Sequence, residues 1–241
     1  MPRLSIIIPT RQEQKAIGTT LANLQPHLTI AHEIIVSDAR STDRTAEIAR
    51  AAGGVVVVYE GTRRHTAGIG RNDGARAARG EFLAFIDADV YIPQPDQFFE
   101  RALAHFADPA VAGVCGPQRA LPEVETWADW ISFSILNASL RFHNNVLHRG
   151  EASGKNMIVR RSTFEQVKGF REDLVTREDG DFFCRLSKVG RTVYDPSLMV
   201  YHGSRRAHKI GWLRLWYIWI ANTIWVTLFD RAIADDWTPV R

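Results

Sequence analysis

The chain has 241 residues, 45% of them hydrophobic and 24% charged, a composition typical of globular proteins and not of disordered ones. Its length suits one α/β domain with a substantial buried core. Thirty basic residues against 27 acidic ones leave a net charge of +3, too small an excess to predict nucleic-acid binding.

Cysteine usage and the N-terminus favour a cytoplasmic protein. Cys115 and Cys184 are the only cysteines of the sequence and lie in no metal-ligand spacing, so we expect two reduced thiols. The apolar run at the N-terminus ends at Pro9 and is too short for a signal peptide.

The first sixty residues alternate short apolar runs with helical patterns. Strands are predicted at 4–8, 33–37 and 55–59, and helices at 15–24 and from the cap-like segment 41–45 to residue 52. This alternation is typical of βαβ units with right-handed crossovers and a parallel sheet. Glu13 and Asp38 follow the first two strands, at the edge where such sheets bind ligands.

The stretch 80–89 is an apolar run that ends in two carboxylates, Asp87 and Asp89. At a strand end, this spacing points both side chains to the same side, where their oxygens could hold a divalent cation. If the pair stood alone, a solvated loop after a strand would be the better explanation.

The segment 67–79 is rich in glycine and arginine. It does not match a dinucleotide fingerprint, because Gly74 arrives one residue late and in the wrong βαβ unit. A phosphate-handling loop fits the glycines, with Arg71 as a forked donor to a diphosphate. The alternative is that Arg71, Arg76 and Arg79 form a solvated helix face.

The second half predicts a strand at 111–116, one or two apolar helices at 123–148 and a strand at 154–161. A capping box at 162–165 predicts a short helix that ends at Gly169. A further helix begins with Glu178, Asp179 and Asp181, whose charges its dipole stabilises. The dipole also keeps a carboxylate ionised, as a general base requires.

The segment 210–229 has four tryptophans and one charge, Arg214. Three interpretations are open: a helix in the membrane interface, a single membrane span, or a helix that packs within the protein or a dimer. The preceding basic run 205–209 would face anionic headgroups in the first case.

Five segments, 5–13, 33–43, 70–76, 80–89 and 177–186, together resemble the inverting family 2 glycosyltransferases over residues 4–202. The resemblance implies the GT-A, or nucleotide-diphosphosugar transferase, fold: α/β, with a Rossmann-like, mostly parallel sheet flanked by helices. The catalytic domain would span 1–204, with a nucleotide-sugar half at 1–117 and an acceptor half at 118–204. An amphipathic tail with an aromatic helix would follow at 205–241.

The resemblance also implies roles for single residues. Asp179 would be the catalytic base, and Glu178 would orient it or the acceptor. Asp89 would bind the metal, Asp87 the metal or the ribose, and His202 would complete the metal site, although a lone histidine is more often structural. The nucleotide sugar would contact Pro9, Thr10, Glu13, Asp38, Arg71, Asp87 and Gly154.

The expected activity is the Mn²⁺- or Mg²⁺-dependent transfer of one sugar, with inversion, from a nucleoside-diphosphate sugar to an acceptor hydroxyl. The aromatic segments favour a lipid or lipid-linked acceptor and a peripheral location on the inner face of the cell membrane. Gln12 and the pair Ala39 and Arg40 depart from the family pattern, which leaves uridine and guanosine donors both open. A sugar nucleotidyltransferase and a non-catalytic nucleotide-sugar-binding protein are the alternatives.

Overall fold

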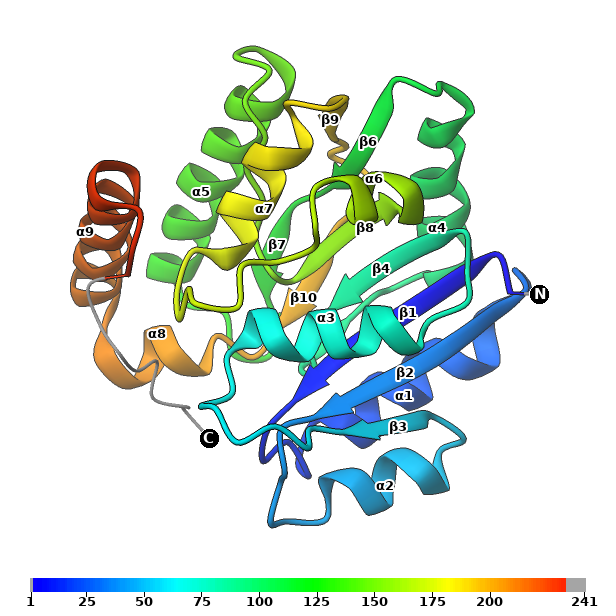
Figure 1. Cartoon of the computed structure of the whole chain (residues 1–241). Helices are drawn as coiled ribbons and strands as arrows, with labels where there is room; N and C mark the ends of the chain where they lie inside the picture. Colours follow the sequence, from blue (N-terminus) through cyan, green and yellow to red (C-terminus); the bar gives the residue numbers. More distant parts are fainter. Residues whose placement is uncertain (1, 233–241) are drawn as a thin grey trace.

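A seven-stranded sheet forms the centre of this computed structural model, which describes residues 2–232 (Figure 1). The strand order is β3-β2-β1-β4-β8-β6-β9, and only β8 runs antiparallel to its neighbours within this sheet. The mostly parallel sheet is therefore confirmed. Its strands are β1 (Leu4–Thr10), β2 (His32–Asp38), β3 (Val55–Val58), β4 (Phe82–Ile86), β6 (Val111–Cys115), β8 (Asn156–Arg160) and β9 (Arg191–Tyr194).

Helices cover both faces of the sheet, and each face has its own apolar core (Figure 1). Successive strand residues point to opposite faces, so Ile6 and Ile8 pack in one core and Ile7 in the other. The first core includes side chains of α1 (Ile17–Leu24), α2 (Thr45–Ala51) and α4 (Pro95–Ala104). The second includes side chains of α3 (Ala67–Ala77), α5 (Trp127–Asn145), α6 (Arg161–Gln166) and α7 (Glu178–Leu186).

A second sheet of three short strands, which we did not predict, lies beside the first. Its order is β5-β10-β7, and the strands are β5 (Val90–Tyr91), β10 (Val200–His202) and β7 (Gln118–Ala120). His202 is in antiparallel register with Val90, the residue after Asp89. This pairing brings two segments that are far apart in sequence to the same place.

The glycine-rich segment forms part of a helix and not a phosphate-handling loop, so that prediction is wrong. Helix α3 already begins at Ala67, with Thr66 as its N-cap. A Cβ atom on Gly74 would lie 2.4 Å from Cγ2 of Ile7, so a glycine is needed for the close packing of α3 on β1.

Some element boundaries also differ from prediction. The capping box predicted at 162–165 is wrong, because α6 begins at Arg161 and the hydroxyl of Thr163 donates to the carbonyls of Ala112 and Arg160. The apolar segment 123–148 forms the single helix α5, with a capping box between Thr126 and Asp129. The helix α4 and the 3₁₀ turns η1 (Gln25–His27) and η2 (His105–Ala107) were not predicted.

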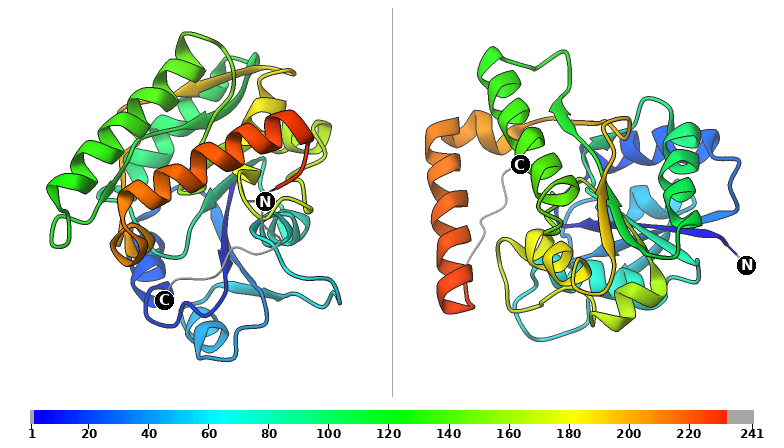
Figure 2. Two further views of the ribbon diagram at one scale, coloured as in Figure 1. Left: turned by 90° about the vertical axis from the view of Figure 1, so that its left-hand side faces the viewer. Right: turned by 90° about the horizontal axis from the view of Figure 1, so that it is seen from above.

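The C-terminal helices α8 (Arg205–Ile210) and α9 (Trp212–Phe229) lie beside α5 (Figure 2). Asp129 is fully buried at this junction. Its oxygens accept a 2.9 Å hydrogen bond from the indole N–H of Trp212 and lie 2.8 Å from Nε2 of His208. His208 therefore faces α5, which differs from the membrane-interface interpretation, in which the basic run 205–209 faces anionic headgroups.

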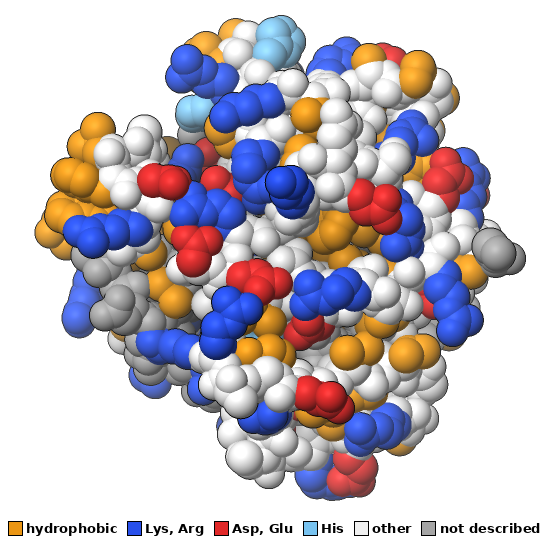
Figure 3. Space-filling model, in the orientation of Figure 1, with side chains coloured by type: hydrophobic (Ala, Val, Ile, Leu, Met, Phe, Trp, Pro, Cys, Tyr) orange, Lys and Arg blue, Asp and Glu red, His pale blue; other side chains and the backbone are white. Residues whose placement is uncertain are grey.

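The outer face of α9 is apolar and exposed. Leu213 is 89% exposed and Tyr217 73%, and hydrophobic side chains gather over α9 in Figure 3. No helix within residues 2–232 has the length and hydropathy required to cross a membrane. The last part of the predicted tail, 233–241, lies outside the described residues.

We expect Asp129→Ala to lower the free energy of unfolding by about 3 kcal/mol at pH 7, because it removes the shared partner of Trp212 and His208 from a buried site. Denaturant unfolding measures this loss. Asp108→Ala, which breaks an exposed pair with Arg191, should cost less than about 1 kcal/mol. Equal losses of unfolding free energy in the two variants would contradict the inference that Asp129 holds the C-terminal helices against α5.

The contribution of Asp129 to the free energy of unfolding should depend on pH. Burial opposes its ionisation, but hydrogen bonds from Thr126, His208 and Trp212 outweigh burial and hold the pKa of Asp129 below its usual value. Its contribution to stability is then complete above the unfolded pKa of about 4 and is lost as the pH falls through the lower folded value. The difference between wild type and Asp129→Ala should therefore shrink in acid.

Candidate active site

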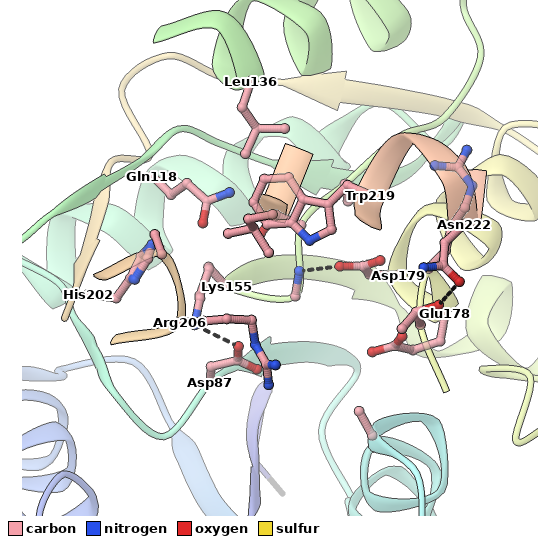
Figure 4. A pocket seen from close by; sticks show the side chains of 18 of the residues that line it. Asp87, Gln118, Leu136, Lys155, Glu178, Asp179, His202, Arg206, Trp219 and Asn222 are labelled. Atoms are coloured by element: carbon pink, nitrogen blue, oxygen red, sulfur yellow. Dashed lines mark hydrogen bonds and ion pairs between the residues drawn. The ribbon is translucent and has the colours of Figure 1, made fainter. Parts of the chain in front are cut away.

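A cavity of about 690 Å³ opens beyond the carboxyl ends of β1 and β4 (Figure 4). It gathers residues from the central sheet, the three-stranded sheet and the C-terminal helices. Asp38 is the one predicted site residue that does not line it. The predicted residues that do are Pro9, Thr10, Glu13, Arg71, Asp87, Asp89, Gly154, Glu178, Asp179 and His202.

Asp38 organises the turn after β2. Its carboxylate accepts hydrogen bonds from the hydroxyl of Thr10 at 3.0 Å and from the hydroxyl and backbone N–H of Ser41 at 2.6 and 2.9 Å. These bonds join the ends of β1 and β2. The contact of Asp38 with a nucleoside base stays a prediction.

Asp87 and Asp89 share a cation, Lys155, which immediately precedes β8. Its Nζ lies 3.0 Å from Oδ2 of Asp87 and 3.1 Å from Oδ1 of Asp89. The two remaining oxygens also face cations. Arg71 Nη2 lies 3.3 Å from Oδ1 of Asp87, and Arg205 Nη2 lies 3.1 Å from Oδ2 of Asp89. The aspartates do lie on one side of the strand end, as predicted, and all four of their oxygens have cationic partners.

These contacts keep the cluster charged. Burial would raise the pKa of Asp89, but Lys155 and Arg205 lower it far below its usual value. Burial would lower the pKa of Lys155, but Asp89 and Asp87 raise it. Arg205 also bonds Glu13 at 3.0 Å, so the first residue of α8 reaches the cavity instead of a lipid surface.

Arg71 is buried, so it is not part of a solvated helix face. Arg76 and Arg79 are exposed, as the solvated-face alternative predicted for them. Its Nη1 lies 2.6 Å from Oε1 of Glu178, and its guanidinium lies 5.3 Å from the ring centre of Phe170. Burial and the neighbouring Asp179 raise the pKa of Glu178, and Arg71 opposes that rise.

Asp179 is held by backbone amides at the first turn of α7. Its Oδ2 accepts from the N–H of Gly154 at 2.7 Å, and its Oδ1 accepts from the N–H of Gly180 at 2.8 Å. A Cβ atom on Gly154 would lie 2.3 Å from Nη2 of Arg71, so only glycine admits both neighbours. Asp179 is thus fixed in orientation while it lines the cavity.

The segment before α7 is tied to α9. The hydroxyl of Thr176 donates to Oδ1 of Asn222 at 3.0 Å, and Arg177 Nη1 donates to the hydroxyl of Thr223 at 3.1 Å. Arg177 also bonds both oxygens of Glu151 and has a left-handed backbone with φ 65°. The residue before the acidic pair is therefore held from two sides in a conformation that few non-glycine residues adopt.

His202 is buried beside the cluster, and its Nε2 has no hydrogen-bond partner among the described residues. Its Nδ1 accepts the backbone N–H of Ser204 at 3.1 Å, which leaves the proton on Nε2. A metal-bound histidine has the opposite pattern, because its second nitrogen donates. Burial and Lys155 lower the pKa of His202 to about 3, so the ring is neutral.

These residues, as they lie, do not fit a divalent cation. The oxygens of Asp87 and Asp89 already have cationic partners, and no three His, Cys, Asp or Glu side chains within residues 2–232 are grouped as metal ligands. The predicted set of Asp87, Asp89 and His202 is therefore not assembled in the part of the chain that the structure describes.

Two features of the cavity escaped prediction. Lys155 follows Gly154 at the start of the predicted strand, and a lysine next to a glycine at a strand start is a weak signal that could have marked it as functional. The apolar wall is the other, because the positions of its tryptophans depend on how α9 packs. This wall includes Leu136, Leu140, Trp212, Leu215, Trp216, Trp219 and Ile220.

A family model described as glycosyl transferase family 2 matches residues 5–168, more than half of the chain. The chain belongs to glycosyltransferase family 2. This membership confirms the resemblance drawn from the sequence motifs.

Two relatives match this chain over only part of their own length. The succinoglycan biosynthesis protein ExoA of Rhizobium meliloti (strain 1021) is 26% identical over 223 residues, which are 86% of this chain and 65% of ExoA. The pre-mycofactocin glycosyltransferase of Mycobacterium tuberculosis (strain ATCC 25618 / H37Rv) is 32% identical over 145 residues, which are 56% of this chain and 29% of that enzyme. The chain thus spans less than two thirds of the length of either relative.

Solved structures confirm the GT-A fold. The mannosyltransferase PcManGT from Pyrobaculum calidifontis, in complex with GDP-Man and Mn²⁺, has a TM-score of 0.70 and 23% identity over 92% of this chain and 62% of its own. Glucosyl-3-phosphoglycerate synthase from Mycobacterium tuberculosis, in complex with Mn²⁺, UDP and glucosyl-3-phosphoglycerate, has a TM-score of 0.62 and 23% identity over 96% and 80%. Divalent metal and nucleotide are therefore bound by proteins of this fold.

We expect Arg71→Met to lower the free energy of unfolding by about 3 kcal/mol at pH 8, because Glu178 must then either stay ionised without its partner in a buried site or take up a proton that the unfolded chain does not hold at this pH. The loss should become smaller toward pH 5. A carboxyl group with a raised folded pKa binds more protons in the folded state, so its unfavourable contribution grows as the pH rises from the unfolded pKa to the folded one.

Denaturant unfolding at several pH values measures this effect. The double variant Arg71→Met/Glu178→Gln is the matched control, because it has no buried carboxylate to leave unpaired. It should be more stable than Arg71→Met at pH 8 and should lack the added pH dependence. A pH-independent loss in Arg71→Met would contradict the role given to Glu178.

Proposed function

We propose that this family 2 protein transfers one sugar from a nucleoside-diphosphate sugar to an acceptor hydroxyl, with inversion at the anomeric carbon. The observation that carries this proposal is the placement of Asp179. It is an aligned carboxylate on the wall of a cavity that lysine and arginine side chains also line. The chain spans only part of the length of its relatives, so the proposal is based on the site and not on their named activities.

Asp179 acts as general base in this mechanism. It accepts the proton of the acceptor hydroxyl while that oxygen attacks the anomeric carbon and the bond to the diphosphate breaks. Glu178 contacts Arg71 at the start of α7, and this contact supports the proposal that it orients Asp179 or the acceptor. The departing negative charge is balanced by the cationic side chains that line the cavity, Lys155 and Arg205 among them.

The donor and acceptor follow from the two ends of the cavity. Pro9, Thr10 and Glu13 border the proposed nucleoside end, beyond β1. Uridine and guanosine donors are both candidates, since solved neighbours bind UDP or GDP-Man. Trp212, Trp216 and Trp219 form the other wall and favour an acceptor with an apolar part, such as a lipid or lipid-linked sugar.

The rival functions fit less well. A sugar nucleotidyltransferase is disfavoured by the family to which the chain belongs. A non-catalytic nucleotide-sugar-binding protein would have no use for a carboxylate aligned by two backbone amides. Mn²⁺ or Mg²⁺ at Asp87 and Asp89 is an alternative for the cation at the diphosphate, and the Mn²⁺ complexes of two structural neighbours favour it.

Asp179→Asn should lower transfer by about 10²- to 10⁴-fold while nucleotide binding stays within a few-fold of wild type, because only the base is removed. The assay incubates the protein with a panel of nucleotide sugars and acceptors and measures free nucleoside diphosphate. Asp181→Asn is the matched control, since Asp181 lies on the same helix but bonds Arg185 at 2.8 Å. Transfer by Asp179→Asn at the wild-type rate would exclude Asp179 as the base.

We also propose that the exposed apolar face of α9 rests on an anionic membrane surface. The double variant Leu213→Glu/Leu228→Glu should then lower cosedimentation with anionic vesicles by about tenfold, because both side chains are largely exposed on that face. Val55→Glu, a change of an exposed apolar residue on β3, is the control and should have no effect. Unchanged cosedimentation of the α9 variant would refute this surface.

A further inference from the structure

We infer that Lys155 is a built-in cation of this site: its ammonium group occupies the place between Asp87 and Asp89 where a divalent metal would bind, and it contacts the departing diphosphate. The second part rests on the proposed function. The first part does not, because it concerns only the contacts of the chain with itself.

The geometry of Lys155 is that of a bridging ion. Its Nζ lies 3.0 and 3.1 Å from one oxygen of each aspartate. The side chain is only 20% exposed, so its stem is packed and its charge is held in one place. Figure 4 shows it directed to Asp87 at the floor of the cavity.

The two oxygens of the pair that Lys155 does not contact also have cationic partners. Arg71 holds the second oxygen of Asp87, and Arg205 the second oxygen of Asp89. Mn²⁺ and Mg²⁺ bind through open carboxylate oxygens and waters. A metal would therefore have to displace Lys155 and leave a buried ammonium group without its partners, which is costly.

The position of Lys155 also couples the cation to the base. The preceding residue, Gly154, donates its backbone N–H to Asp179 at 2.7 Å. The two residues just before β8 thus have two roles: Lys155 places its ammonium group beside the diphosphate, and Gly154 holds Asp179 through its backbone N–H. A lysine supplies its charge without an ion from solution, so nucleotide binding and transfer should be independent of divalent metal.

Direct Mn²⁺ titration, followed by electron paramagnetic resonance of the free ion, tests the occupancy of the site with and without UDP and GDP. The proteins are wild type, Lys155→Met and Lys155→Met/Asp89→Asn. Methionine keeps the apolar stem and removes the charge, so Lys155→Met should bind Mn²⁺ at least about tenfold more tightly than wild type. The double variant should lose this gain.

Mn²⁺ binding is also compared between wild type and Asp89→Asn, two proteins in which Lys155 is unchanged. Equal, weak Mn²⁺ binding by these two proteins supports the inference. Tight Mn²⁺ binding by wild type that Asp89→Asn abolishes would overturn it, and so would a folded Lys155→Met that binds no more Mn²⁺ than wild type. Thermal unfolding identifies the folded variants.

Transfer assays with EDTA test the role of Lys155 in the reaction. Wild type should keep its rate within about twofold, whereas Lys155→Met should lose activity and recover it in part with Mn²⁺. Loss of wild-type transfer in EDTA would overturn the proposed role. If no nucleotide sugar is turned over under any condition, the proposed function fails, while the Mn²⁺ titration still decides the occupancy of the site.

Discussion

The buried guanidinium of Arg71 is the contact on which the site depends. It bonds Glu178 at the start of α7 and Asp87 after β4, and its Nη2 lies where a Cβ atom on Gly154, before β8, would have to be. Three segments that are far apart in sequence thus meet on one side chain. Since a charge at such depth is tolerated only with its partners in place, the two acidic motifs are placed correctly only together.

The fold supplies these partners from two sheets. The parallel strands of the central sheet end at one edge and bring Thr10 and Asp87 to the cavity, as doubly wound folds do. The three-stranded sheet adds His202 and the start of α8, and thereby Arg205. The C-terminal helices then close the apolar side. The cavity is therefore polar where the central sheet ends and aromatic where α9 passes.

Sequence patterns predicted the parts of this arrangement that local physics determines. The apolar runs of β1, β2 and β4, and the acids that follow them, were visible because buried parallel strands are continuous apolar segments. β5 and β10, with two and three residues, carry no periodicity that could reveal them. The partners of Lys155, Arg71 and Arg205 depend on tertiary packing, and long cations look alike in sequence whether they face solvent or a buried carboxylate.

The hydrogen bonds from Thr176 and Arg177 to α9 link the position of one helix to that of another. Asp179 is two residues beyond Arg177, so these two hydrogen bonds connect the start of α7 to α9. The outer face of α9 is exposed, and its inner face lines the cavity. The orientation of Asp179 therefore depends on how α9 packs against the segment that precedes α7.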